Sequence, residues 1–123
     1  MCDKSPIAGV LVIDKPRGPT SMSMVNLVRR RASESRENRV KTGHAGTLDP
    51  LATGVLVLGL GKMTKRLGEL TLTNKRYTTT IDLSATTAGH DDESPRVEIK
   101  VETPPTQEEV VKTLETFCGT ILQ

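Results

Sequence analysis

One segment of this sequence combines a carboxylate with a backbone that holds it in place. The segment reads Gly43-His-Ala-Gly-Thr-Leu-Asp-Pro-Leu-Ala-Thr-Gly54, and its acidic residue is Asp49. Pro50 has a fixed φ angle and pushes the backbone of Asp49 into an extended conformation. Gly46 and Gly54 permit backbone angles that other residues avoid. The pattern predicts a carboxylate on a rigid loop, although an Asp-Pro turn without a chemical role is the simpler interpretation.

Basic residues flank this segment on both sides. Lys41 precedes it, and Lys62, Lys65 and Arg66 follow it. Residues 1–80 contain 14 Lys and Arg against 6 Asp and Glu, whereas residues 81–123 contain 3 against 9, so the formal net charge of +2 hides a basic and an acidic part. An acid among these bases is either paired with them or acts on a ligand that they hold. The basic part favours a polyanion partner, and a solvated basic face is the alternative.

The elements that must position this segment are predicted from periodicity. The β-branched run 9–13 predicts a buried strand. Thr20 or Ser21 can cap a helix that ends near Arg31 and has Val25, Val28 and Ala32 on one face. A polar loop is expected over 33–39, a strand over 55–58 and a short helix over 64–70.

The second half of the chain predicts two strands and a helix. Apolar and polar residues alternate over 76–83 and again over 96–101, separated by a polar loop over 84–95. Thr106 and Glu109 form a capping box that opens a helix, and residues 120–123 resemble the start of a further strand. The inward face of that helix is expected to consist of Val110, Val111, Leu114 and Phe117. The order of elements indicates an α+β fold.

Composition excludes several classes of protein. The 123 residues are 35% hydrophobic and 26% charged, which is typical of one folded domain and not of a disordered tail. No apolar run approaches the length of a membrane span, and no secretory signal is predicted. Cys2 and Cys118 have no metal-ligand spacing, which favours a reducing cytoplasm and indicates neither a zinc site nor a disulfide framework.

A nucleotide-binding loop is the first alternative function, suggested by Gly59-Leu-Gly-Lys62. A P-loop requires a glycine five residues before Gly61 and a serine or threonine after the lysine. Leu56 and Met63 occupy these positions, so the residues exclude this motif.

Several motifs together resemble one enzyme family. The segment 43–54 is similar to the signature of the bacterial tRNA pseudouridine synthases of the TruB family. Gly9-Val-Leu-Val-Ile-Asp-Lys-Pro16, with Gly18 and Thr20-Ser21, resembles the opening motif of that family. Gly61-Lys-x-Thr-Lys65 and Lys75-Arg-Tyr77 resemble later motifs in the same order. The resemblance covers most of residues 9–83.

The resemblance implies a reaction and roles for named residues. The expected activity is isomerisation of the T-loop uridine at position 55 of tRNA to pseudouridine, without cofactor or metal. Asp49 matches the family's catalytic aspartate, Tyr77 the tyrosine that stacks on the target base, and His44 the histidine that enters the T-loop as the uridine leaves. Lys41, Lys62, Lys65 and Arg66 are expected to contact tRNA phosphates. Lys15 matches the opening motif and is expected to be structural.

The resemblance also implies that the chain is part of a larger domain. Family catalytic domains have a mixed, largely antiparallel sheet flanked by helices, and residues 1–123 correspond to the N-terminal portion. The C-terminal half supplies an arginine partner for the catalytic aspartate, and many members add an RNA-binding domain. We therefore expect a monomeric cytoplasmic protein with little or no activity from this chain alone. A non-catalytic RNA-binding fragment is the alternative.

Overall fold

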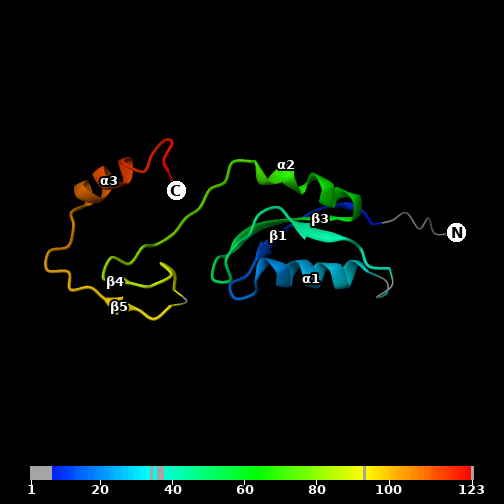
Figure 1. Ribbon diagram of the computed structural model, residues 1–123, viewed down its shortest axis with the longest axis horizontal. Helices are drawn as coiled ribbons and strands as arrows, with labels where there is room; N and C mark the ends of the chain where they lie inside the picture. The colour runs from blue at the N-terminus through cyan, green and yellow to red at the C-terminus, as the bar shows by residue number, and fades with distance from the viewer. Residues whose placement is uncertain (1–6, 34, 36–37, 93, 123) are drawn as a thin grey trace. The chain divides into compact units, whose positions relative to one another are not determined.

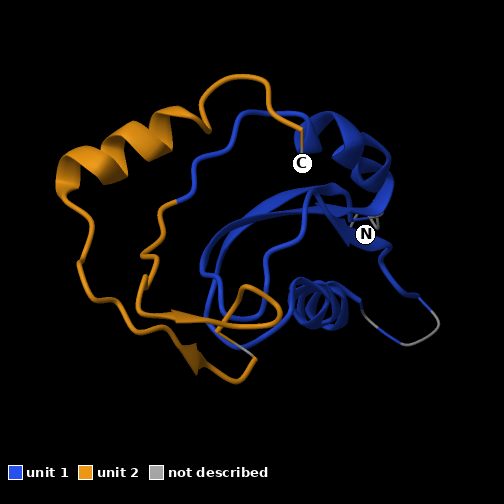
Figure 2. Ribbon diagram, turned by 60° about the vertical axis from the view of Figure 1, so that its left-hand side comes forward, with its two compact units in different colours: residues 1–77 blue, residues 78–123 orange. Residues whose placement is uncertain are grey.

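The computed structural model describes residues 7–33, 35, 38–92 and 94–122. The chain divides into two units, residues 1–77 and residues 78–123, each described by itself (Figure 2). Both units combine short helices with antiparallel strand pairs, so the predicted α+β class is confirmed. The short helix predicted over 64–70 is in the structure a 3-10 helix over Gly61–Arg66 followed by an α-helix over Leu67–Thr71.

Unit 1 is built on a three-stranded antiparallel sheet (Figure 1). Its strands are β1 (Gly9–Lys15), β2 (Thr42–His44) and β3 (Gly54–Leu60), and β3 lies between the other two. Gly9 pairs with Leu60 and Lys15 pairs with Gly54, so β1 and β3 are matched along their whole length. Strand β2 is missing from the prediction, because three residues are too few to show an alternating pattern.

Helices cover both faces of this sheet. Helix α1 (Ser21–Ala32) lies on one face, and the 3-10 helix η1 (Gly61–Arg66) with α2 (Leu67–Thr71) lies on the other (Figures 1 and 2). Val25 of α1 packs with Leu56 and Leu58 of β3 to form the buried core. These two leucines are two residues apart, so they point to the same face of the strand.

On the sheet face opposite α1, the packing of α2 requires that two positions of the sheet have no side chain. Gly43 and Gly59 are paired in the sheet, and a Cβ atom at either would lie 3.0–3.1 Å from the side chain of Leu67. Gly59 is buried. The first residue of α2 therefore packs directly on bare backbone, which explains why β3 carries a glycine in a run of valine and leucine.

The predicted strand over 9–13 forms, but it is not buried as expected. Val10 and Val12 are 45% and 60% exposed, whereas Ile13 packs against the core. Strand β1 is at the edge of the sheet, and alternate residues point to opposite faces. Leu11, on the same face as Ile13, is also 39% exposed, so the helices cover only part of this edge strand.

Helix α1 confirms the predicted cap and face. The side chain of Thr20, not Ser21, accepts the hydrogen bond from the Ser23 backbone N–H at 3.0 Å. Val25 is fully buried, and Val28 packs against the core as expected. Ser33 ends the helix, and the residues described between it and Lys41 form no helix or strand, as predicted.

Unit 2 lacks the strand predicted over 76–83. These residues are irregular, and the first strand is instead β4 (Ala85–Thr86), within the expected loop. It pairs with β5 (Val97–Glu98), which occupies two of the six residues predicted over 96–101. Alternation alone does not make a strand, because the backbone also needs a neighbour to which it can hydrogen-bond.

Helix α3 (Gln107–Glu115) forms with the predicted capping box, but its apolar face is not inward. Val110, Val111, Leu114 and Phe117 are 36–65% exposed. None of the described residues from 78 to 122 is buried, so nothing there covers this face. Residues 120–122 do not form the predicted strand.

The described residues show neither a membrane-spanning helix nor a metal-binding group of side chains. No helix there is long and apolar enough to cross a membrane. In the same part of the chain, no group of three or more His, Cys, Asp or Glu residues is placed to hold a metal ion. Cys118 is free and exposed, and Cys2 lies outside the described residues.

Candidate active site

Asp49 lies in the loop that connects β2 to β3. Its carbonyl oxygen accepts a hydrogen bond from the Ala52 N–H at 3.1 Å, which closes a tight turn around Pro50. The residue is exposed, and no described side chain pairs with its carboxylate. The predicted placement of this carboxylate on a loop is therefore confirmed, and the carboxylate is exposed.

Lys15 holds the residue that follows Asp49. Its side chain is fully buried at the end of β1, and its Nζ donates to the carbonyl oxygens of Pro16, Pro19 and Pro50 at 3.0, 2.8 and 3.2 Å. An ammonium group has three donors, so all of them are used. The Gly18 N–H also donates to Pro50, at 2.7 Å. A buried ammonium with three backbone partners fits the structural role expected for Lys15.

Ser21 holds the residue that precedes Asp49. Its Oγ accepts from the Leu48 N–H at 2.9 Å and donates to the Leu48 carbonyl at 3.0 Å. Ser21 is 2% exposed, and the Leu48 side chain packs against the core. Because Thr20 caps the helix, the Ser21 hydroxyl is available for this contact. The backbone is thus fixed on both sides of Asp49.

The glycines of the loop adopt the predicted angles. Gly46 and Gly54 have φ values of +105° and +119°, in the region that favours glycine. They lie on either side of the Asp49 turn. This part of the sequence prediction is confirmed.

His44 is the last residue of β2 and begins the chain segment that leads to Asp49. Its Nδ1 is buried and has no hydrogen-bond partner in the part of the chain that is described. Buried polar atoms without partners are uncommon in folded proteins and call for an explanation. The ring is therefore held by packing and β-sheet position rather than by a hydrogen bond to Nδ1.

Tyr77 is not a strand residue, contrary to the sequence prediction. It is 71% exposed and lies in the irregular segment after α2, at the end of unit 1. An isolated tyrosine with this exposure has its ring face available for stacking. Among the described residues no hydrogen bond joins the Tyr77 ring to Asp49 or His44, so the structure does not link these three residues into one hydrogen-bonded site.

The structure separates the basic residues from Asp49. The Lys41 carbonyl accepts from the Gly61 N–H at 2.8 Å, so Lys41 and Lys62 lie where β3 ends. Asp49 lies near the start of β3, held by residues that follow β1. A seven-residue strand spans roughly 20 Å, so these lysines are not ion-pair partners of the carboxylate.

Lys65 and Arg66 lie in η1, which follows β3 directly and packs on the sheet face opposite α1. Lys65 is exposed. The Arg66 guanidinium donates from Nε and Nη2 to one oxygen of Glu69, at 3.0 and 2.9 Å. Both side chains are about two-thirds exposed, so this pair adds little stability. Among the described residues, Arg66 is nevertheless the one predicted phosphate contact that already has an acidic partner.

Comparison with known proteins identifies the family. Residues 30–123 match the TruB family pseudouridylate synthase (N terminal domain). The chain belongs to the TruB family. This confirms the resemblance drawn from the motifs.

The relatives of the TruB family that this chain resembles carry the same name, tRNA pseudouridine synthase B. The protein of Mycobacterium sp. (strain KMS) is 44% identical over 115 residues, covering 94% of this chain and 37% of the relative. That of Bacteroides fragilis (strain YCH46) is 45% identical over 118 residues, covering 93% and 49%. That of Thermobifida fusca (strain YX) is 51% identical over 90 residues, covering 73% and 29%. The chain therefore spans half or less of the length of these TruB relatives.

The contact of Ser21 with Leu48 was not predicted. From the sequence, Ser21 is an alternative helix cap and part of the opening motif, and a hydrogen bond to a residue 27 positions away has no local signal. The pair Thr20-Ser21 contains a partial signal, because only one of two adjacent hydroxyls can cap the same helix.

Proposed function

We propose that this chain carries the catalytic aspartate of a tRNA pseudouridine synthase. The reaction would convert the T-loop uridine at position 55 of tRNA to pseudouridine. The observation that carries this proposal is the Asp49 carboxylate, which is exposed while the backbone on both sides of it is fixed. The relatives named tRNA pseudouridine synthase B support the choice of substrate.

The proposed chemistry breaks one bond to the sugar and forms another. The bond between C1′ and N1 of uracil breaks, the base rotates, and a bond between C1′ and C5 forms. Asp49 either attacks the sugar or stabilises its positive charge, as carboxylates do in glycoside hydrolysis. The C5 proton then leaves and N1 gains a proton, so the base keeps its composition. If Asp49 has bonded to C1′, that bond breaks as C5 attacks, and the reaction requires neither cofactor nor metal.

His44 and Tyr77 have proposed roles in holding the RNA. The target base must leave its stack before Asp49 can reach the sugar. Tyr77, with most of its surface exposed, would stack on that base, and its phenol would assist loss of the C5 proton. His44 would occupy the place in the T-loop that the base leaves.

Four basic residues are proposed to contact tRNA phosphates. Lys41, Lys62 and Lys65 are exposed and have no described acidic partner, which supports this role. To contact a phosphate, the Arg66 guanidinium would have to bind the phosphate and Glu69 together, or break its ion pair with Glu69. Such contacts set affinity rather than sequence preference.

The proposal extends to the domain and its setting. Residues 1–123 would be the N-terminal portion of a pseudouridine synthase catalytic domain, acting as a monomer in the cytoplasm. Exposed apolar side chains on α3 support an incomplete domain, because an amphipathic helix normally buries that face.

The test joins this chain to the part of the Mycobacterium sp. (strain KMS) relative that lies beyond its matched residues. Release of tritium from T-arm RNA labelled at C5 of uridine measures the reaction directly. We expect turnover from the joined protein and a loss on the order of 10³-fold or more with Asp49→Asn. Asp14→Asn is the matched control, since Asp14 is also an exposed aspartate of unit 1. Equal activity of Asp49→Asn and the joined parent protein contradicts the proposal.

A non-catalytic RNA-binding fragment is the second candidate. The absence of buried residues over the described part of 78–122 favours it for the chain alone. We expect the isolated 123-residue protein to release little or no tritium. Turnover by the isolated chain would exclude this candidate.

A further inference from the structure

Unit 1 has a groove along α1. Its lining continues from the helix to Ser35 and Arg39, and its volume is about 570 Å³. Ser23, Asn26, Arg30 and Ser33 recur every three or four residues, so they form one stripe on the helix. This stripe differs from the one that contains Val25, which packs on the sheet. The full lining is Ser23, Asn26, Arg29, Arg30, Ser33, Ser35 and Arg39.

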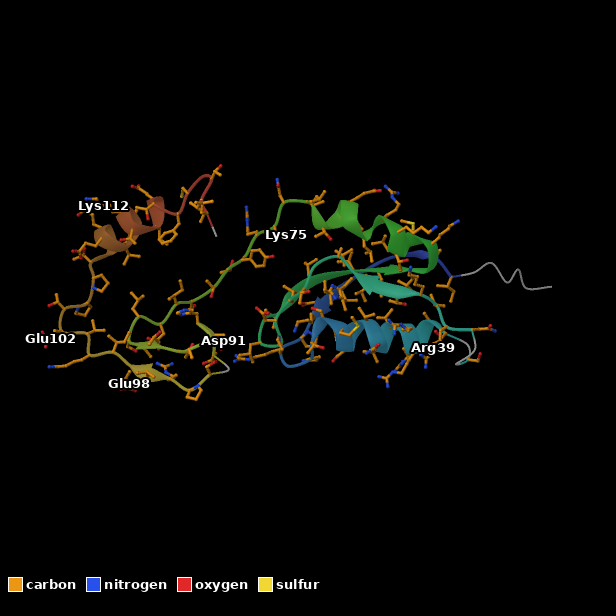
Figure 3. All side chains as sticks on the ribbon, viewed as in Figure 1. Arg39, Lys75, Asp91, Glu98, Glu102 and Lys112 are labelled. Atoms are coloured by element: carbon orange, nitrogen blue, oxygen red, sulfur yellow. The ribbon has the colours of Figure 1, made fainter. Side chains whose placement is uncertain are left out.

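The groove is positively charged. Arg29 donates to two neutral acceptors, the side-chain oxygen of Asn26 and the backbone carbonyl of Thr42, both at 3.2 Å. Arg29, Arg30 and Arg39 take part in none of the ion pairs between described residues. Three guanidinium charges exceed the half negative charge of the helix C-terminus that lies beside them. Figure 3 labels Arg39 near that end of α1.

The chemistry of the lining matches phosphate oxygens. Guanidinium, hydroxyl and amide groups donate hydrogen bonds, and guanidinium binds phosphate with two parallel bonds. The lining contains no aromatic residue on which a base could stack. A groove of this composition binds the backbone of a nucleic acid rather than its bases.

The place of the groove connects it with Asp49. Ser21, which holds the loop of Asp49, and Arg30 lie nine residues apart on α1. This is about 14 Å along the helix axis. An RNA strand in the groove can therefore continue toward the carboxylate.

We propose that the groove of Arg29, Arg30 and Arg39 binds consecutive phosphates of the RNA that presents its uridine to Asp49. This inference rests on the RNA substrate proposed above. It assigns a binding role to α1, whose Arg29 donates to the Thr42 carbonyl at the end of the sheet where Lys41 also lies.

The test measures binding of the 123-residue chain to an RNA hairpin with the T-arm stem and loop, by fluorescence anisotropy at several salt concentrations. The groove variant combines Arg30→Gln and Arg39→Gln and leaves Arg29, which also bonds to Thr42, in place. The control variant combines Lys100→Gln and Lys112→Gln in unit 2 and removes the same charge. Circular dichroism establishes that each variant is folded.

We expect the plot of log affinity against log salt to lose about 1.5 in slope for the groove variant and to stay unchanged for the control. Equal slopes for the groove variant and the parent chain overturn the groove proposal and leave the catalytic proposal standing. Binding of poly-glutamate as tightly as RNA also overturns it, because the surface would then accept an acidic protein. The tritium assay on the joined protein tests the proposed function separately.

Discussion

At the scale of single residues, Asp49 is defined by its neighbours more than by its own contacts. The Leu48 backbone is bonded to Ser21 and the Pro50 carbonyl to Lys15 and Gly18, while the carboxylate itself is exposed. A catalytic group held in one geometry loses less entropy when it reacts. Ser21 and Lys15 are thus positioning residues for the proposed reaction.

Replacement of Ser21 by alanine is expected to destabilise unit 1. The change leaves the N–H and the carbonyl of Leu48 without their side-chain partner, at a cost of about 1–3 kcal/mol. Urea unfolding measures the difference. Ser23→Ala is the control, because Ser23 is exposed and its loss should cost under about 0.5 kcal/mol. Equal stability of the two variants would contradict the role of Ser21.

At the scale of elements, close packing of α2 on the sheet depends on glycine. A Cβ atom at Gly59 would lie 3.0 Å from Leu67 and 3.1 Å from the Met63 carbonyl oxygen, whereas one at Gly68 would contact nothing within 4 Å. The same substitution at these two positions should therefore have opposite effects on stability.

Gly59→Ala is expected to lower the free energy of unfolding by about 1–3 kcal/mol, because the added methyl group overpacks a buried site. Gly68→Ala is expected to raise it by up to about 1 kcal/mol, since alanine favours a helix over glycine. Thermal unfolding of both variants beside the parent chain measures the two changes. A stabilising Gly59→Ala would show that α2 does not pack on this strand.

Helix α3 should depend on pH through its capping box. Backbone and side-chain hydrogen bonds from Thr106 hold the pKa of Glu109 below its ordinary value of 4.5. A carboxyl group whose pKa is lower in the folded state than in the unfolded state stabilises the folded state at pH values above its pKa in the unfolded state. The stabilisation is lost as the pH falls from about 4.5 through the lowered value.

We expect the helical signal of α3 to fall over this acid range in the parent chain. Glu109→Gln should remove this dependence and keep the helix, because glutamine can also complete a capping box. Amide chemical shifts of Thr106 and Glu109, followed by NMR during acid titration, measure the effect. The same titration curve in parent and variant would count against the capping box.

The sequence predicted elements well where local residues determine them. The cap of α1, its buried Val25, the turn at Asp49 and the capping box of α3 all follow from neighbouring residues. The prediction failed where residues far apart in the chain determine the structure. The strand expected over 76–83 has no neighbour, and the contact of Ser21 with Leu48 joins residues far apart in the chain.

At the scale of the whole chain, the two units differ in what stabilises them. Unit 1 has a buried core of Val25, Leu56 and Leu58, whereas no described residue of unit 2 is buried. Ion pairs such as Arg96 with Asp82 are exposed and add little. Local stability should therefore be concentrated in residues 9–71.

Amide hydrogen exchange measures this distribution. We expect β3 to be among the slowest segments to exchange, because it lies between two strands, and residues 78–122 to exchange rapidly. The ratio between the two should be at least on the order of 10²-fold at neutral pH if unit 1 has a few kcal/mol of stability. Equal protection of the amides of both units would contradict the prediction that stability is concentrated in residues 9–71.

The burial of Lys15 also affects how the chain reacts with chemicals. Its nitrogen is enclosed and bonded to three carbonyls, whereas Lys41, Lys62 and Lys65 are exposed. An amine-reactive reagent should therefore acylate the exposed lysines first and reach Lys15 only when the loop around Asp49 opens. Mass spectrometry of the labelled chain thus turns this one lysine into a reporter of whether the loop is closed.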